Sequence, residues 1–272
     1  MFRAISLGAG VQSTVMALMA ARGEIEPMPD CAIFADTQWE PQGVYDHLDW
    51  LETQLPFPVY RVTEGDIRRD TLHASQNGKD EKGRFATVPF FTLEGDNKGM
   101  GRRQCTYEYK LKPIRKKLRE LVGLKKGQRV ARGWIVAHTW LGISTDEAGR
   151  MKPSRDAWQF NVYPLILNNI SRQDCIAWFA KNYPGRALAK SACIGCPFHN
   201  NVQWRDMKIN DPTSFADAVE FDEGIRYPEN NEDIRQFLHA NRKPLAEVDL
   251  QNLEDKGQLN LFMNECEGMC GV

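Results

Sequence analysis

Five of the seven cysteines stand in contexts that suggest chemistry, and two of them form a C-x-x-C pair. They are Cys105, Cys193, Cys196, Cys266 and Cys270. A C-x-x-C turn places two thiolates close enough to share one iron–sulfur cluster or one zinc ion, and a pair without metal is the alternative. Cys31 and Cys175 lie inside apolar patterns, so we expect them to be small buried hydrophobic residues.

A glycine-rich stretch near the N-terminus, SLGAGVQST at 6–14, joins a predicted strand to a predicted helix. Glycines let the backbone turn tightly, and the N–H groups and dipole of a helix N-terminus attract anions. The stretch is not a Walker A loop and lacks the full G-x-G-x-x-G pattern. We predict a phosphate-binding turn, with a tight serine-capped turn as the alternative. The expected contacts are Ser6, Gly8, Gly10, Gln12, Ser13 and Thr14.

The charges are distributed unevenly although the net charge is only −1. Residues 102–132 contain twelve Lys or Arg against two Glu, whereas residues 211–272 contain fourteen acidic residues against five basic ones. Positive charge beside Cys105 would lower the pKa of its thiol and attract phosphate. The cations expected to do so are Arg102, Arg103, Lys110 and Lys112. The basic segment as a whole predicts a surface for a nucleic acid, and solvated helix faces are the alternative.

The elements that must position these residues alternate along the first part of the chain. We predict strands at 2–7, 31–35 and 58–62, separated by helices at 11–22 and 41–54. Such alternation predicts an α/β fold with a doubly wound, mostly parallel sheet, whose ligands bind beyond the carboxyl ends of the strands.

The later segments are less regular. A long functional loop is expected at 76–101, a basic helix after it, and another strand within 129–144 that leads into a loop at 144–150. Ser171 and Asp174 predict the capped start of a helix that ends before Pro184. Two amphipathic helices are expected at 213–225 and 231–242. We therefore predict a nucleotide-binding domain at 1–165 and a C-terminal region at 166–272 with the C-x-x-C, helices and a cysteine-containing tail.

Length and composition favour a globular protein with a sizeable core. The chain has 272 residues, of which 42% are hydrophobic and 26% charged, and it has no apolar run long enough to span a membrane. The N-terminus does not read as a secretory signal, so we expect a soluble cytoplasmic protein with no membrane partner. In a reducing cytoplasm, metal binding or catalysis is expected of the cysteines rather than a disulfide framework.

Four segments resemble motifs of one superfamily. SLGAGVQST resembles the PP-loop of N-type ATP pyrophosphatases and phosphoadenosine phosphosulfate reductases, S-G-G-x-D-S or S-[FL]-G-x-x-S, although Gln12 stands where Asp is common. FADTQWEP at 34–41 is similar to D-T-G-x-x-x-P-E. QCTYEYKLKPI at 104–114 is similar to the motif C-C-x-x-x-K-x-x-P-L. WLGISTDEAGR at 140–150 is similar to the motif G-[IV]-R-x-x-E-S-x-x-R. In the family a C-x-x-C follows these motifs, as Cys193 and Cys196 do here. The resemblance implies an adenine-nucleotide-binding α/β fold of the PP-loop type, with Asp36, Thr37 and Glu40 near the nucleotide.

The resemblance also implies a ligand set for a 4Fe-4S cluster. Family members with a cluster use an adjacent Cys-Cys pair and the later C-x-x-C, and Gln104 here replaces the first cysteine. Cys105, Cys193 and Cys196 would then leave one iron open to a hydrosulfide or a substrate atom. His199, Cys266 or Cys270 as a fourth ligand, and zinc in place of the cluster, are the alternatives.

The tail segment NECEGMCGV at 264–272 resembles the C-terminal E-C-G-x-H of the reductases, in which a tail cysteine attacks sulfur. Cys266 and Cys270 are therefore candidate catalytic residues, for example in a persulfide relay. An idle, disordered tail is the alternative.

Three functions follow from these features. The favoured one is ATP-dependent transfer of sulfur to a nucleic acid or small acceptor, with magnesium accompanying ATP and a sulfur-donor protein as partner. The second is a sulfonucleotide reductase, in which Arg150, Arg102 and Lys110 bind the sulfate end, Cys266 attacks, and a thioredoxin-like protein supplies electrons. The third is a non-catalytic zinc protein that binds nucleotides or nucleic acid.

Overall fold

The computed structural model describes residues 1–251 except 78, 80–87, 132 and 229–232. Two compact units are present, and each is assembled from separate stretches of the chain. Unit 1 contains Met1–Asp36, Gln42–Thr63 and Lys110–Ser191; unit 2 contains Thr37–Pro41, Glu64–Tyr109 and the residues from Ala192 onward. The boundary predicted after residue 165 falls inside unit 1.

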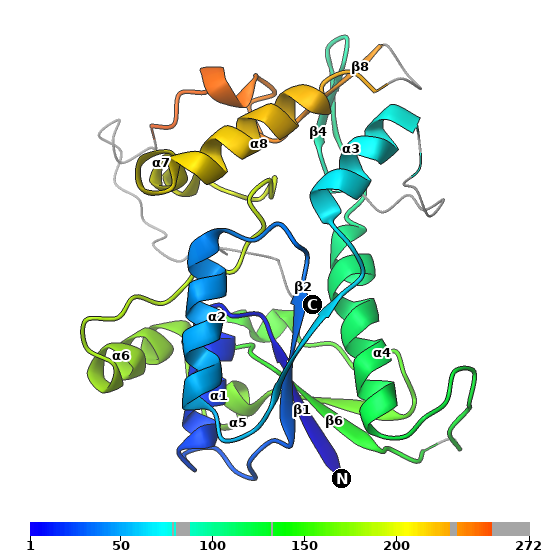
Figure 1. Cartoon of the computed structure of the whole chain (residues 1–272), viewed down its shortest axis with the longest axis vertical. Helices are drawn as coiled ribbons and strands as arrows, with labels where there is room; N and C mark the ends of the chain where they lie inside the picture. The colour runs from blue at the N-terminus through cyan, green and yellow to red at the C-terminus, as the bar shows by residue number, and fades with distance from the viewer. Residues whose placement is uncertain (78, 80–87, 132, 229–232, 252–272) are drawn as a thin grey trace. The chain divides into compact units, whose positions relative to one another are not determined.

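Unit 1 is built on a five-stranded sheet in which every neighbouring pair is parallel (Figure 1). The strands, in the order β3-β2-β1-β6-β7, are β3 (Val59–Thr63), β2 (Cys31–Asp36), β1 (Phe2–Leu7), β6 (Ala137–Leu141) and β7 (Gln159–Val162). The predicted α/β class with a parallel sheet is confirmed. The first three predicted strands match β1, β2 and β3 to within one residue at each end.

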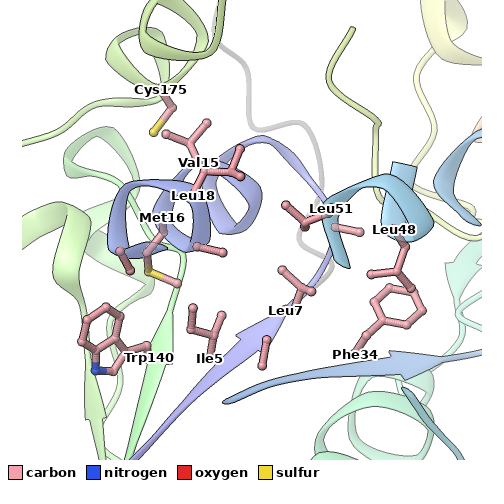
Figure 2. Packing of buried hydrophobic residues seen from close by; sticks show 14 of the residues in the cluster. Ile5, Leu7, Val15, Met16, Leu18, Phe34, Leu48, Leu51, Trp140 and Cys175 are labelled. Atoms are coloured by element: carbon pink, nitrogen blue, oxygen red, sulfur yellow. The ribbon is translucent and has the colours of Figure 1, made fainter. Parts of the chain in front are cut away.

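Helices cover both faces of this sheet. They are α1 (Val11–Ala21), α2 (Gln42–Gln54), α4 (Lys112–Leu121), α5 (Pro164–Leu167) and α6 (Arg172–Asn182). Ile5 and Leu7 of β1 pack with α1 and α2 on one face, as Figure 2 shows, whereas Ala4 packs on the other with Leu118 of α4. This alternation follows from the two-residue period of a strand and explains why strands buried on both faces are almost wholly apolar.

Local signals within unit 1 behave as predicted. Ser171 and Asp174 form a reciprocal capping box at the start of α6, which supplies acceptors for two otherwise unpaired N–H groups. Cys31 and Cys175 are both buried in the core, and burial raises the pKa of each thiol to about 12. No helix among the described residues is long and apolar enough to cross a membrane.

Unit 2 combines a small antiparallel sheet with helices. Its elements are α3 (Ile67–Asn77), β4 (Phe91–Glu94), β5 (Asn97–Met100), α7 (Asn201–Asn210), α8 (Pro212–Gly224), β8 (Ile234–Phe237) and the short 3-10 helix η3 (Leu245–Glu247). A π-helical turn, η1 (Thr106–Leu111), leads from unit 2 into α4. The order of the sheet is β5-β4-β8.

Two predictions for unit 2 are wrong. The segment 76–101 is not one long loop, because β4 and β5 form a hairpin within it. The helix predicted at 231–242 is absent from its described part, where β8 pairs with β4. The few apolar residues of this segment fit a strand as well as a helix, and pairing with β4 decides between them.

A buried carboxylate fixes the chain that follows β8. Asp222 of α8 accepts hydrogen bonds from the N–H groups of Leu238 and Leu245, at 2.7 and 2.9 Å, and it pairs with Arg226 one turn along the helix. Burial raises the pKa of Asp222, against the opposing effect of these donors. The segment from β8 to η3 is thereby attached to α8.

A buried histidine supports α1 from α2. The hydroxyl of Thr14 and Nε2 of His47 lie 3.1 Å apart, and His47 is only 4% exposed. Burial, assisted by the charge of Arg186, lowers the pKa of His47 to about 4. The folded state therefore binds fewer protons than the unfolded chain between pH 4 and the ordinary histidine pKa of about 6.5.

We expect the free energy of unfolding to fall as the pH decreases from about 6.5 to about 4, because the unfolded chain takes up a proton that folded His47 does not. The contribution of His47 over this interval is about 3 kcal/mol. In His47→Gln this part of the pH dependence should disappear, as measured by urea unfolding at several pH values. An identical slope in the two proteins would contradict the assignment.

Candidate nucleotide and cysteine sites

The topology of unit 1 makes one end of the sheet the candidate ligand site. Strand β1 lies between β2 and β6. The chain first adds β2 and β3 on one side of β1 and later adds β6 and β7 on the other side. In open α/β sheets, ligands bind beyond the carboxyl ends of the strands at such a switch point. The two segments that follow these ends are Gly8–Gly10 after β1 and Gly142–Ser144 after β6. The predicted phosphate-binding turn is therefore at the expected edge.

The turn between β1 and α1 is strained and internally braced. Buried Ala9, rather than either glycine, has the left-handed backbone conformation, with φ of 54°. Ser13 Oγ accepts a hydrogen bond from Gly8 N at 3.2 Å and donates to the carbonyl of Gly10 at 3.3 Å. The helix starts at Gly10 without a side-chain cap. A non-glycine residue in this conformation costs free energy and is found mainly where function requires it.

Two close backbone contacts hold the turn from outside. A Cβ atom on Gly142 would lie 2.8 Å from the N atom of Ser13, so only glycine allows the end of β6 to reach α1. A Cβ atom on Gly10 would lie 3.3 Å from Cβ of Ser191. Both glycines permit close approach and neither has a positive φ. Gly142 and Ser191 were not among the predicted site residues, although Gly142 lies in the segment 140–150 and Ser191 precedes the C-x-x-C by two positions.

Gln12 is the centre of a polar network beside the turn. Its amide donates to Glu147 Oε2 at 3.3 Å, and its carbonyl oxygen accepts from Arg172 Nη1 at 3.2 Å. Glu147 in turn accepts from Arg150 at 2.6 Å, within the 3-10 helix η2 (Thr145–Arg150). An amide can donate and accept at once, whereas an aspartate here would be repelled by Glu147. Arg150, predicted to be catalytic, is joined to the turn through Glu147.

The other predicted nucleotide contacts are divided between the units. Ser6 lies in β1, and Thr14 is fully buried against His47. Asp36, at the end of β2, accepts a hydrogen bond from the hydroxyl of Tyr45 at 2.9 Å. Thr37 and Glu40 belong to unit 2, where they contact a cysteine.

That cysteine is Cys193, and its thiol lies in a buried polar cluster. Cys193 Sγ is 3.4 Å from Glu40 Oε1 and 3.3 Å from Thr37 Oγ1, and Thr37 donates to the same carboxylate oxygen at 3.1 Å. All three residues are buried. A thiol must lose its proton before it binds a soft metal or attacks sulfur, and the Glu40 carboxylate is within reach of that proton.

Trp39 fixes the C-x-x-C turn against this cluster. A Cβ atom on Gly195 would collide with the Trp39 indole, and Ile194 N donates to the carbonyl of Trp39 at 2.9 Å. The indole N–H bonds to Asp217 of α8 at 2.5 Å. Gln38, next to Trp39, has a positive φ of 59°. Gly195 is thus needed for contact with the ring.

Cys105 and Arg103 come from the segment before η1. Half-buried Cys105 packs against the hydrophobic cluster that includes Cys193. The guanidinium of Arg103 lies 5.3 Å from the centre of the Phe198 ring, two residues beyond Cys196. Its Nε and Nη2 atoms are buried and have no hydrogen-bond partner among the described residues. Buried donors without acceptors are costly, so this guanidinium can accommodate an anion.

The remaining predicted site residues do not form one cluster within the described part of the chain. Arg102 is exposed in unit 2, whereas Lys110 and Lys112 are half-buried residues of unit 1. Cys266 and Cys270 lie outside the described residues. Within the described part of the chain, no three His, Cys, Asp or Glu side chains are grouped so as to hold a metal ion. The cluster and its zinc alternative therefore stay predictions.

We expect Gly142→Ala to destabilise the protein, because its methyl group would displace Ser13 at the start of α1. Overpacking of this kind costs about 1–3 kcal/mol. Gly149→Ala is the matched control, since its Cβ would meet nothing within 4 Å. Urea unfolding of both variants provides the measurement, and equal midpoints for the two would show that the close approach is unimportant.

Comparison with known proteins does not assign the chain to a family. No protein-family model matches the chain, and no curated protein matches it. The assignment of function therefore depends on the residues and contacts described above.

Proposed function

We propose that the protein is an ATP-dependent sulfur-transfer enzyme. The observation that carries the proposal is the braced turn Gly8–Ser13 at the switch point of the parallel sheet. A glycine-rich turn with an uncapped helix start is suited to phosphate, and the motifs that accompany it resemble those of PP-loop enzymes. Unit 1 would bind the adenine nucleotide, with magnesium on its phosphates.

Unit 2 supports the sulfur part of the proposal. Cys193 and Cys196 share one turn, and Cys193 is the thiol with a buried carboxylate beside it. Cys31 and Cys175, by contrast, are core thiols whose raised pKa keeps them protonated. The proposal assigns nucleotide activation to unit 1 and sulfur delivery to the cysteine turn of unit 2.

The chemistry would take two steps. An oxygen atom of the acceptor attacks the α-phosphate of ATP and pyrophosphate leaves, which converts that oxygen into part of a good leaving group. A hydrosulfide then forms a bond to the acceptor carbon, the bond between that carbon and the activated oxygen breaks, and AMP departs. Glu40 would accept the proton from the Cys193 thiol, so that Cys193 is a thiolate when sulfur is transferred.

A sulfonucleotide reductase is the second candidate, and Arg103 is the observation that favours it. Its unpaired guanidinium near Cys105 and Phe198 could bind the sulfate of adenylyl sulfate as well as a phosphate. Against it, Gln104 replaces one cysteine of the adjacent pair. The two candidates differ in the nucleotide they consume.

Calorimetric titration with ATP and with adenylyl sulfate tests the nucleotide assignment. We expect ATP to bind and Gly10→Val to weaken it by about tenfold or more, since the new side chain would meet Ser191. The control is Gly43→Val in α2, where a Cβ meets nothing within 4 Å. Reduction of adenylyl sulfate with a thiol donor, without any response to ATP, would replace the proposal with the reductase.

Iron and sulfide assays on anaerobically purified protein test the predicted cluster. We expect iron and acid-labile sulfide in the wild type, their loss in Cys193→Ala, and their retention in Cys31→Ala, because Cys31 is a core thiol. Unchanged iron in Cys193→Ala would contradict the ligand assignment. A colourless protein with stoichiometric zinc would favour the non-catalytic alternative.

A further inference from the structure

The loop between α4 and β6, residues 122–136, presents positive charge without compensation. Lys125, Lys126 and Arg129 are exposed and have no ion-pair partner among the described residues. Between Glu120 and Asp146 the sequence contains no acidic residue. Other cations of the basic segment are engaged within unit 1: Arg115 pairs with Asp156, and Lys117 pairs with Glu120. Within the described part of unit 1, the positive charge of the basic segment that is not used in ion pairs or hydrogen bonds therefore lies in this loop and on Lys116, an exposed residue of α4.

Hydrogen bonds fix the backbone of the first part of the loop, around Lys125 and Gln128. Arg119 Nη2 donates to the carbonyls of Lys125 and Gln128, at 2.8 and 2.9 Å, and Lys125 N donates to Gln128 Oε1 at 3.0 Å. Leu124, Val130 and Val136 pack against the core cluster that contains Trp158. A surface whose backbone is already ordered loses less conformational entropy when it binds a partner.

Trp134 is the aromatic residue of this loop and is 68% exposed. Four other tryptophans, Trp39, Trp140, Trp158 and Trp204, are at most 5% exposed. The backbone N–H of Trp134 donates to the carbonyl of Ala131, which holds in place the backbone that carries the exposed indole. An exposed aromatic ring on the same loop as unpaired cations is a combination that binds single-stranded nucleic acid, by stacking on a base while the cations contact phosphates.

We infer that the described residues of this loop, 122–131 and 133–136, form a binding surface for single-stranded nucleic acid through Lys125, Lys126, Arg129 and Trp134. The inference builds on the proposed function, since it names the acceptor class, but its residues are separate from the nucleotide turn. A membrane fits less well, because the loop offers one exposed aromatic rather than a broad apolar face. A single strand is favoured over a duplex because a stacked indole requires an accessible base face.

Fluorescence anisotropy with labelled single-stranded RNA and DNA of about 16 nucleotides, without ATP, tests the inference. Three phosphate contacts predict a slope of about −2 for the logarithm of affinity against the logarithm of salt concentration. Lys125→Glu with Lys126→Glu should weaken binding about tenfold or more and flatten the slope by about 1. The matched control is Lys98→Glu with Lys243→Glu, which makes the same charge change at exposed positions of unit 2 and should have little effect.

The aromatic contact has its own variants. Trp134→Ala should weaken binding about tenfold, Trp134→Phe should restore most of it, and Tyr227→Ala, at an exposed aromatic of unit 2, should change nothing. Equal losses in the two charge-reversed pairs, no binding by the wild type at low salt, or preferential binding to phosphatidylserine vesicles would overturn the inference. ATP titration of the same variants separates the proposals, because nucleic-acid binding without ATP binding would refute only the proposed function.

Discussion

Close backbone packing at the start of α1 is the constraint on which the candidate nucleotide site depends. The N-terminal turn of the helix is contacted by Gly142 after β6 and by Ser191 far later in the chain, and a side chain on Gly142 or Gly10 would obstruct one of these contacts. Ser13 braces the same turn from within. The strained residue Ala9 therefore lies in a turn that is held both by the local bonds of Ser13 and by contacts from distant parts of the sequence.

Polar groups around the two candidate sites are arranged by complementarity. Gln12 satisfies a carboxylate and a guanidinium at the same time, which an acidic residue could not do. In unit 2 the buried carboxylate of Glu40 is shared by a hydroxyl and a thiol. Two buried donor atoms of Arg103, Nε and Nη2, have no acceptor within the described residues.

The sequence predicted the elements whose signals are local. Apolar strands, the end of α1 near Gly23 and the capping box at Ser171 each depend on a few neighbouring residues, and they were predicted to within one or two residues. β8 was mistaken for a helix because its conformation is decided by pairing with β4. Contacts such as Gly142 with Ser13, or Cys193 with Glu40, join residues more than a hundred positions apart, and no pattern in one sequence reveals them.

The segmented construction of the two units affects how the chain can fold during synthesis. β6 is a hydrogen-bonded neighbour of β1, yet the ribosome makes it only after β2, β3 and the first half of unit 2. Until residue 137 has emerged, β1 is an edge strand with unpaired N–H and C=O groups. The nascent chain must therefore protect an open sheet edge until β6 has emerged, and truncated products that end before β6 would be prone to aggregate through it.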